Sequence, residues 1–124
     1  MSQIEKRDIF WLGSSLKDLS KLSDDVQETF NLGLVLAAQG KQHPDAYPLK
    51  GFGGNSVLEI IEDERNSTFR AVYTIRFKKA VYVLHVFQKK SKKKIATPKE
   101  EMDLIELRLK KAAGHYKEHF GSGG

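Results

Sequence analysis

The chain has 124 residues and no cysteine; 40% of its residues are hydrophobic and 30% are charged. This composition fits one globular domain and excludes a wholly disordered chain, disulfides, thiolate metal sites and cysteine nucleophiles. No apolar run approaches the ~20 residues that a membrane helix needs, and the N-terminus lacks the apolar region of a signal peptide. We therefore expect a soluble, cytoplasmic protein with one domain over residues 1–120 and a flexible Gly-Ser tail over 121–124.

The charge is informative mainly through its distribution. Eleven of the 21 basic residues and none of the 16 acidic ones lie between Arg65 and Lys99, so this segment carries +11 and the rest of the chain carries −6. A basic block in an otherwise acidic chain favours a surface that faces a polyanion such as nucleic acid. The alternative is a lysine-rich sheet edge, which protects a protein against aggregation.

The first predicted elements are a short strand and a short helix. Residues 9–12 form an apolar run that ends at Gly13, which predicts a strand. Ser14 or Ser15 can cap the helix that follows. The expected apolar face of this helix consists of Leu16, Leu19 and Leu22.

A longer helix is expected to begin at Asp24. Gln27 follows three residues later in the spacing of a capping box, and Gly40 provides the C-terminal stop. Joined by a tight turn, the two helices form an α-hairpin. The apolar stripe of the second helix consists of Val26, Phe30, Leu34 and Ala37.

The middle of the chain is predicted to be a loop followed by three strands. Prolines and glycines make residues 42–55 a loop. The strands are too apolar for a sheet with one fully wet face, so helices should cover much of one side. A polar turn at 62–67 and a tight hairpin at Lys78 and Lys79 separate the strands. Their expected ranges are 57–61, 69–77 and 80–88.

The clearest local signal begins the last helix. Thr97 fits the N-cap, Pro98 the first helical position and Glu100 the capping box. The helix should run to about Tyr116 or beyond. The order of elements predicts an α+β fold in which an N-terminal strand and a helical hairpin pack on a small, mostly antiparallel sheet with a C-terminal helix. The apolar residues of the last helix are Met102, Ile105, Leu109, Ala112 and Tyr116.

Two arginines on the strand at 69–77 are candidates for chemistry. Alternation places Arg70 and Arg76 on the face opposite the expected core residues. A guanidinium suits phosphate binding, which is our interpretation of Arg70. The alternative is a surface ion pair with Glu59 or Glu62, an interpretation that fits Arg76 better. The expected core face consists of Phe69, Ala71, Tyr73, Ile75 and Phe77.

A run of lysines follows the last strand. As a cluster, these lysines can form an electrostatic track for a phosphate backbone, and Phe87 and Tyr82 can stack on bases. The alternatives are a solvated loop and two core aromatics. The run consists of Lys89, Lys90, Lys92, Lys93 and Lys94.

Among the histidines, only His85 falls in an expected strand, on the same side as Val83 and Phe87. Its ordinary pKa suits acid–base catalysis, and a buried, hydrogen-bonded histidine is the alternative. His115 and His119 have the i, i+4 spacing of metal ligands but lack a third ligand, and no phosphate-binding loop occurs. We therefore expect neither a metal nor a cofactor.

Several segments occur in a specific order: PLKG at 48–51, LE at 58–59, FRAVY at 69–73, VLHVFQKKS at 83–91 and TP at 97–98. The assembled pattern resembles the RelE/ParE superfamily of toxins from toxin–antitoxin systems, most of all its phage-derived HigB-like branch. It extends from Ile9 to about Tyr116. Two positions depart from the ribonuclease members, because no arginine follows Glu59 and Tyr116 falls inside a helix.

This resemblance implies a RelE-like fold and cleavage of mRNA in the ribosomal A site without a metal. A 2′-hydroxyl would attack the adjacent phosphodiester and leave a 2′,3′-cyclic phosphate and a 5′-hydroxyl. Arg70 would hold the scissile phosphate, while Lys89 and Lys50 would add charge and proton transfer. His85 would take part in acid–base chemistry. The residues expected to bind RNA are Arg76, Lys90, Lys92, Lys93 and Lys94.

The resemblance also implies partners. Toxins of this kind have a cognate antitoxin, commonly with a helix-turn-helix domain, so the expected partners are that antitoxin, the ribosome and mRNA, and no membrane. Two alternatives share the fold or the charge: a gyrase poison that acts by protein binding, and an RNA-binding module without catalysis. Products with 5′-hydroxyl ends distinguish the ribonuclease from both.

Overall fold

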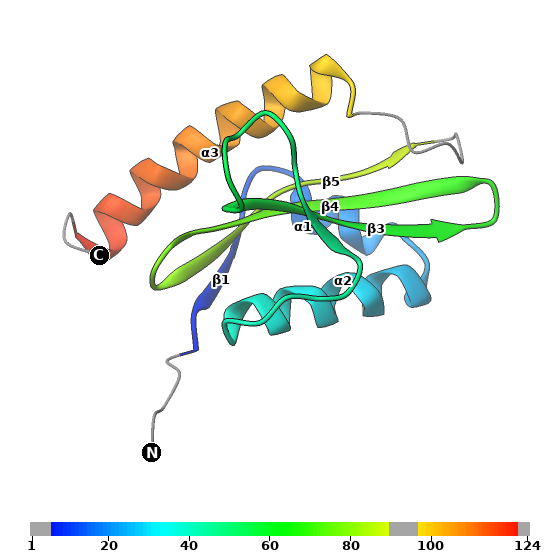
Figure 1. The fold of residues 1–124 in the computed structure, drawn as a ribbon, viewed down its shortest axis with the longest axis horizontal. Coiled ribbons are helices and arrows are strands. Elements are labelled where there is room, and N and C mark those ends of the chain that lie inside the picture. The colour runs from blue at the N-terminus through cyan, green and yellow to red at the C-terminus, as the bar shows by residue number, and fades with distance from the viewer. Residues whose placement is uncertain (1–5, 90–96, 122–124) are drawn as a thin grey trace.

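The computed structural model describes residues 6–89 and 97–121 (Figure 1). The predicted RNA-binding residues Lys90, Lys92, Lys93 and Lys94, and tail residues 122–124, lie outside these ranges. The elements in chain order are β1 (Asp8–Trp11), α1 (Ser15–Ser20), α2 (Asp24–Ala38), β2 (Ala46–Pro48), β3 (Val57–Glu64), β4 (Ser67–Phe77), β5 (Ala80–Lys89) and α3 (Lys99–Phe120).

The sheet has the strand order β1-β5-β4-β3-β2. β3, β4 and β5 form an antiparallel meander, and β2 pairs antiparallel with β3. β1 pairs parallel with β5, which the long stretch of chain between them, from α1 to β4, permits. The predicted meander, and the addition of the N-terminal strand to it, are confirmed.

Helices cover both faces of the sheet, so the prediction that they cover one side is wrong (Figure 1). The reason is that the strands are apolar on both faces, and each apolar face must be buried against another layer. α1 and α2 pack on one face and α3 packs on the other. The core on the α2 side includes Phe30, Leu34, Ile60 and Tyr73, and the core on the α3 side includes Tyr82, Leu84, Ile105 and Tyr116.

A bulge on β5 interrupts the ladder with β4. Val72 pairs with His85 but Tyr73 pairs with Val83, so Leu84 is an extra residue on β5. An extra residue reverses the alternation of side chains beyond it and bends the strand. His85 consequently faces α3, whereas Val83 packs under α2.

A second irregularity, on β4 between Thr74 and Phe77, restores the register. Two predictions from simple alternation are therefore wrong. Phe77 packs under α3 rather than with the core residues of its own strand, and His85 shares its face with Phe87 but not with Val83. A bulge of this kind leaves no periodic pattern in the sequence, so alternation alone could not predict it.

The beginning of α2 differs slightly from prediction. Ser23 is the N-cap, because its hydroxyl accepts a 3.3 Å hydrogen bond from the backbone N–H of Val26, so Asp24 is the first helical residue. Gly40, with a φ of 79°, ends the helix region as expected. In α1, Leu16 is 51% exposed, so it does not share the buried face of Leu19.

The start of α3 also corrects the prediction. Pro98 occupies the N-cap position and accepts the first helical bond, from Met102 N–H, through its carbonyl. Thr97 precedes the cap and instead accepts a hydrogen bond from Arg70. The helix extends four residues past Tyr116, to Phe120. Within the described ranges, no helix is long and apolar enough to cross a membrane.

The connections are tighter than predicted. The loop expected at 42–55 contains the short strand β2, and the polar stretch expected as a turn at 62–67 belongs largely to β3 and β4. Only Arg65 and Asn66 join these strands, and Arg65 takes a left-handed backbone with a φ of 57°. The turn was predicted too long because the residues at this end of the sheet are polar. Their side chains can remain in water while their backbones pair, so polarity does not mark the ends of the strands.

Candidate active site

Strand pairing places three predicted site residues on the face of the sheet that α3 covers. Arg70 on β4 lies opposite Phe87 on β5, and Lys89 lies opposite Thr68 at the end of the same ladder. Because His85 follows the bulge, it shares this face with Phe87, and their rings stack with centroids 4.7 Å apart. Residues 70, 85 and 89 are thereby gathered near the first turns of α3.

Arg70 forms a buried ion pair with Glu59 on the neighbouring strand. One guanidinium nitrogen, Nη1, donates to both carboxylate oxygens at 3.2 Å and also to Thr97 Oγ1 at 3.4 Å. The side chains are only 4% and 10% exposed. The surface ion pair considered as an alternative is thus a buried one, which orients Arg70 on the α3 side.

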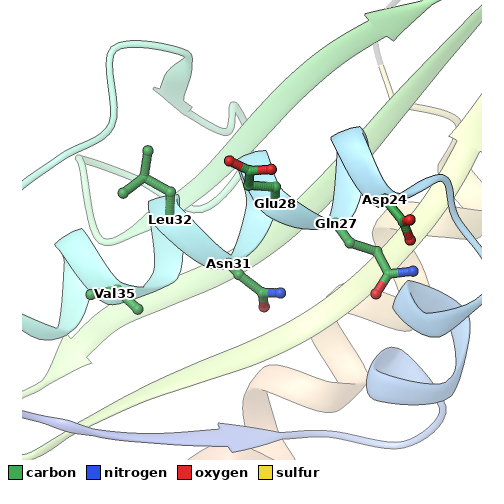
Figure 2. Close-up of a pocket in the computed structure, with 6 residues that line it drawn as sticks. All are labelled: Asp24, Gln27, Glu28, Asn31, Leu32 and Val35. Atoms are coloured by element: carbon green, nitrogen blue, oxygen red, sulfur yellow. The ribbon is translucent and has the colours of Figure 1, made fainter.

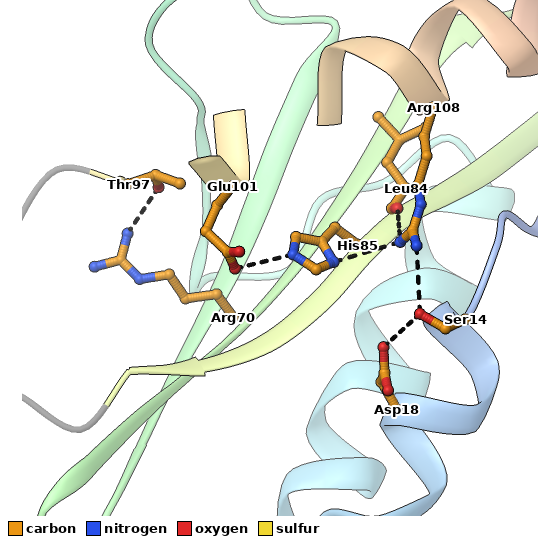
Figure 3. Close-up of polar contacts among 8 residues, drawn as sticks. All are labelled: Ser14, Asp18, Arg70, Leu84, His85, Thr97, Glu101 and Arg108. Atoms are coloured by element: carbon orange, nitrogen blue, oxygen red, sulfur yellow. Dashed lines mark hydrogen bonds and ion pairs between the residues drawn. The ribbon is translucent and has the colours of Figure 1, made fainter. Parts of the chain in front are cut away.

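His85 lies at the centre of a second polar cluster (Figure 3). Its Nε2 is 2.9 Å from Glu101 Oε2, and its Nδ1 is 3.4 Å from Arg108 Nη1. Arg108 Nη1 also donates to the carbonyl of Leu84 at 2.9 Å. Leu84 is the extra residue of the β5 bulge, so Arg108 satisfies a carbonyl at the irregular point of the ladder.

The cluster continues to α1. Arg108 Nη2 donates to Ser14 Oγ at 3.3 Å, and Ser14 Oγ donates to Asp18 Oδ2 at 2.8 Å. Gly13 permits this approach: a Cβ at its position would lie 2.6 Å from the guanidinium of Arg108. The turn between β1 and α1 therefore holds Arg108 against the sheet.

Burial is the main cause that lowers the pKa of His85 below its usual 6.5. The hydrogen bond and charge of Glu101 act in the opposite direction, as does the charge of Asp18, while the charge of Arg108 adds to the lowering. With its ring 7% exposed, His85 favours the neutral imidazole near neutral pH.

Lys89 is half-buried at the end of β5. Burial lowers the pKa of its ammonium, and the nearby positive charge of Arg70 lowers it further, whereas Glu59 and Glu101 raise it. Lys89 therefore lies near both polar clusters, close to Arg70 and Glu101. A lysine in such surroundings gives up its proton more readily than one in water.

Two other predicted site residues lie on a different part of β4 and in the loop after β2. Arg76 is six residues beyond Arg70 on the same strand, a separation of about 20 Å, and its side chain donates to Ser56 Oγ at 3.4 Å. Lys50 is exposed in the loop after β2, which rises toward α3 (Figure 1). Its neighbour Gly51 lies against Met102 in the first turns of α3.

A pocket on the other side of the sheet has a different character. It lies along the outer face of α2 (Figure 2), where the carboxylates of Asp24 and Glu28 repel a phosphate and the apolar side chains offer it no hydrogen bond. Over the described parts of the chain, no group of three histidine, aspartate or glutamate side chains could hold a metal ion. The pocket is lined by Asp24, Gln27, Glu28, Asn31, Leu32 and Val35.

With this geometry established, comparison with known proteins is informative. The sequence pattern of the family described as phage-derived protein Gp49-like matches residues 17–110. The chain belongs to the Gp49-like family. No curated protein matches it in sequence.

A solved structure supports the fold of this Gp49-like protein. A mutant of the E. coli toxin RelE, in the free state, has a TM-score of 0.52 at 21% sequence identity, over 86% of this chain and 97% of that one. The RelE-like α+β fold and the phage-derived family expected from the sequence are confirmed.

The sequence interpretation missed two residues of the Gp49-like site, Glu101 and Arg108, which are the partners of His85. It named Glu59 as an ion-pair partner, but at the surface rather than buried. The spacing of Glu101, Ile105 and Arg108, at i, i+4 and i+7, puts two charges beside a buried residue on one helix face. That spacing could have identified Glu101 and Arg108 as candidate site residues from the sequence.

Proposed function

We propose that this Gp49-like protein is the toxin of a type II toxin–antitoxin system and that it cleaves mRNA at the ribosome without a metal cofactor. The family and the RelE fold support the class of protein. The observation that carries the proposal is the convergence of two cations and a carboxylate–histidine pair from β4, β5 and α3. These groups are Arg70, Lys89, His85 and Glu101.

The proposed chemistry matches the groups in this cluster. Attack of a 2′-hydroxyl on the adjacent phosphorus needs a base, positive charge to stabilise the phosphorane-like state, and an acid for the departing 5′ oxygen. Arg70 and Lys89 supply the positive charge from neighbouring strands. The lowered pKa of Lys89 also suits it to protonate the 5′ oxygen.

Arg70 would bind the scissile phosphate by exchanging partners. In the structure its Nη1 donates to the two oxygens of Glu59. A phosphate offers oxyanions of the same kind and geometry, so the guanidinium keeps charge-assisted hydrogen bonds when it moves from the carboxylate to the substrate. Glu59 thus holds Arg70 on the correct face until RNA arrives.

The remaining basic residues would hold the RNA backbone outside the cleavage point. Arg76 and Gly51, the neighbour of Lys50, line one pocket on the side of the sheet that α3 covers. Contacts of this kind add affinity for phosphates without reading the bases. The proposed set for RNA binding is Lys50, Arg76, Lys90, Lys92, Lys93 and Lys94.

The proposed partners follow from the proposed class. A cognate antitoxin, with a helix-turn-helix domain, would neutralise the toxin by direct contact, and the ribosome would present the mRNA. The site of action would then be the cytoplasm. Recovery of a tightly bound antitoxin that relieves growth arrest supports this assignment.

The test is controlled expression of the wild type, Lys89→Met and Lys41→Met, with growth followed and mRNA 5′ ends mapped. Lys41 is an exposed lysine after α2, on the other side of the molecule, and provides a matched loss of charge. We expect growth arrest and new in-frame 5′ ends for the wild type and Lys41→Met, and weaker arrest with fewer new ends for Lys89→Met.

Two results would contradict the proposal. Arrest with intact mRNA and DNA damage would indicate a gyrase poison, and binding to RNA without cleavage or arrest would indicate a binding module. Equal cleavage by Lys89→Met and the wild type would remove Lys89 from the site while leaving the ribonuclease function in place.

A further inference from the structure

The histidine of the site has no ring nitrogen left for a substrate. A guanidinium can only donate hydrogen bonds, so Nδ1 of His85 accepts the bond from Arg108. The ring proton is then on Nε2, where it points to Glu101 Oε2 at 2.9 Å. Because the ring is also 7% exposed, His85 is badly placed to take a proton from RNA.

The group of this pair that reaches solvent is the carboxylate. The Glu101 side chain is 29% exposed, compared with 8% for the His85 side chain. A carboxylate has two oxygens and about four lone-pair positions, so one bond from His85 leaves capacity to accept another proton. Figure 3 shows Glu101 between His85 and Arg70, on the first turn of α3.

The surroundings of Glu101 fit a role in the reaction. The charge of Glu101 raises the pKa of Lys89, whereas the charge of Arg70 lowers it. Glu101 and Arg70 therefore both lie near Lys89. Arg70 itself contacts Thr97, four residues before Glu101. A base and two cations around one point are the arrangement that cleavage of a phosphodiester needs.

We propose that Glu101 is the general base of this site, and that His85 and Arg108 are positioning residues that hold its carboxylate. This assignment rests on the proposed ribonuclease function. It also replaces the acid–base role expected for His85, which becomes an orienting donor. Arg108 fixes the ring through Nδ1 and is itself held by the Leu84 carbonyl and Ser14.

The proton balance of the step is complete. The Glu101 carboxylate takes the proton of the 2′-hydroxyl as the bond from O2′ to phosphorus forms. The Lys89 ammonium gives a proton to the 5′ oxygen as the bond from phosphorus to that oxygen breaks. Water then removes the proton from Glu101 and returns one to Lys89, and no oxidant, reductant or metal takes part.

The experiment measures single-turnover cleavage of mRNA on purified ribosome complexes as a function of pH. Glu101→Gln keeps the shape of the side chain but loses the base, so we expect a 10²- to 10⁴-fold slower reaction and loss of the acid limb of the rate profile. Glu100→Gln is the matched control. The carboxylate of Glu100 is next to Glu101 in the sequence but is exposed, so we expect a rate close to that of the wild type.

His85→Phe tests the positioning role. It keeps an aromatic ring against Phe87 but loses the hydrogen bond to Glu101. That bond orients the Glu101 carboxylate, so its loss should lower the single-turnover rate constant. A variant that only perturbed the fold would lower the amplitude of the reaction, which reports the amount of active protein, without changing that rate constant.

The outcomes separate the two proposals. If the wild type cleaves and Glu101→Gln cleaves at the same rate with the same pH profile, Glu101 is not the base, although the ribonuclease function stands. If the wild type cleaves no RNA, on or off the ribosome, both proposals are wrong. Circular dichroism and RNA affinity equal to those of the wild type would exclude misfolding as the cause of a slow Glu101→Gln.

Discussion

At the scale of single residues, the pair of Arg70 and Glu59 links stability to the proposed chemistry. Both side chains are almost fully buried, so removing one leaves the other charge unpaired inside the protein. We expect Arg70→Ala to lower the free energy of unfolding in urea by about 3–5 kcal/mol. Arg76→Ala, an exposed arginine on the same strand, should cost about 0.5 kcal/mol or less.

This prediction has a direct check. Replacing both partners, as in Arg70→Met with Glu59→Leu, removes both buried charges and should recover much of the stability that either single substitution loses. If Arg70→Ala is as stable as the wild type, the pair is not buried in solution. Because it also unpairs a buried charge, Arg70→Ala is a poor probe of activity by itself.

The pKa of His85 gives a second prediction at this scale. Burial lowers it, so the folded state favours the neutral ring while an unfolded histidine titrates near 6.5. The contribution of His85 to stability is present above about pH 6.5 and is lost as the pH falls through the lower, folded pKa. The free energy of unfolding in urea should therefore fall more steeply toward acid pH in the wild type than in His85→Gln. Equal slopes for the two proteins would contradict a buried, neutral His85.

At the scale of elements, the site depends on the β5 bulge and on the α3 side chain that braces it. Arg108 satisfies the Leu84 carbonyl, and the missing side chain of Gly13 makes room for its guanidinium. Gly13→Ala should displace Arg108 and shift the ring resonances of His85 in NMR spectra. Gly53→Ala introduces a similar left-handed strain in open space, so its His85 resonances should not move. Equal shifts in both variants would argue against the brace.

The elements that could be predicted from the sequence are those determined by interactions between residues close together in the chain. The apolar stripes of α2 and α3 and the meander were readable, because periodicity is a local property of the sequence. The Leu84 bulge and the capping by Ser23 were not, since they depend on a partner strand or on competition between neighbouring hydroxyls. The same limit applies to the site: Arg70, His85 and Lys89 were found as residue types and Glu59 as an ion-pair partner, but the partners of His85 on α3 were not found.

At the scale of the whole molecule, two helical layers enclose the sheet, and residues 67–89 of the basic segment form β4, β5 and their hairpin. This arrangement predicts binding of RNA with a strong dependence on salt. Each phosphate contact in single-stranded RNA contributes a slope of about −0.7 in a plot of log K against log salt concentration. Lys89→Met should reduce the magnitude of the slope by about that amount, as measured by fluorescence anisotropy. An unchanged slope would show that Lys89 makes no phosphate contact.

We propose that this Gp49-like protein cleaves mRNA by attack of the 2′-hydroxyl. The most direct test identifies the ends of RNA that the purified protein produces from translating ribosomes. We expect fragments that begin with a 5′-hydroxyl and end with a 2′,3′-cyclic phosphate. Fragments with 5′-phosphates, or intact mRNA after growth arrest, would contradict it.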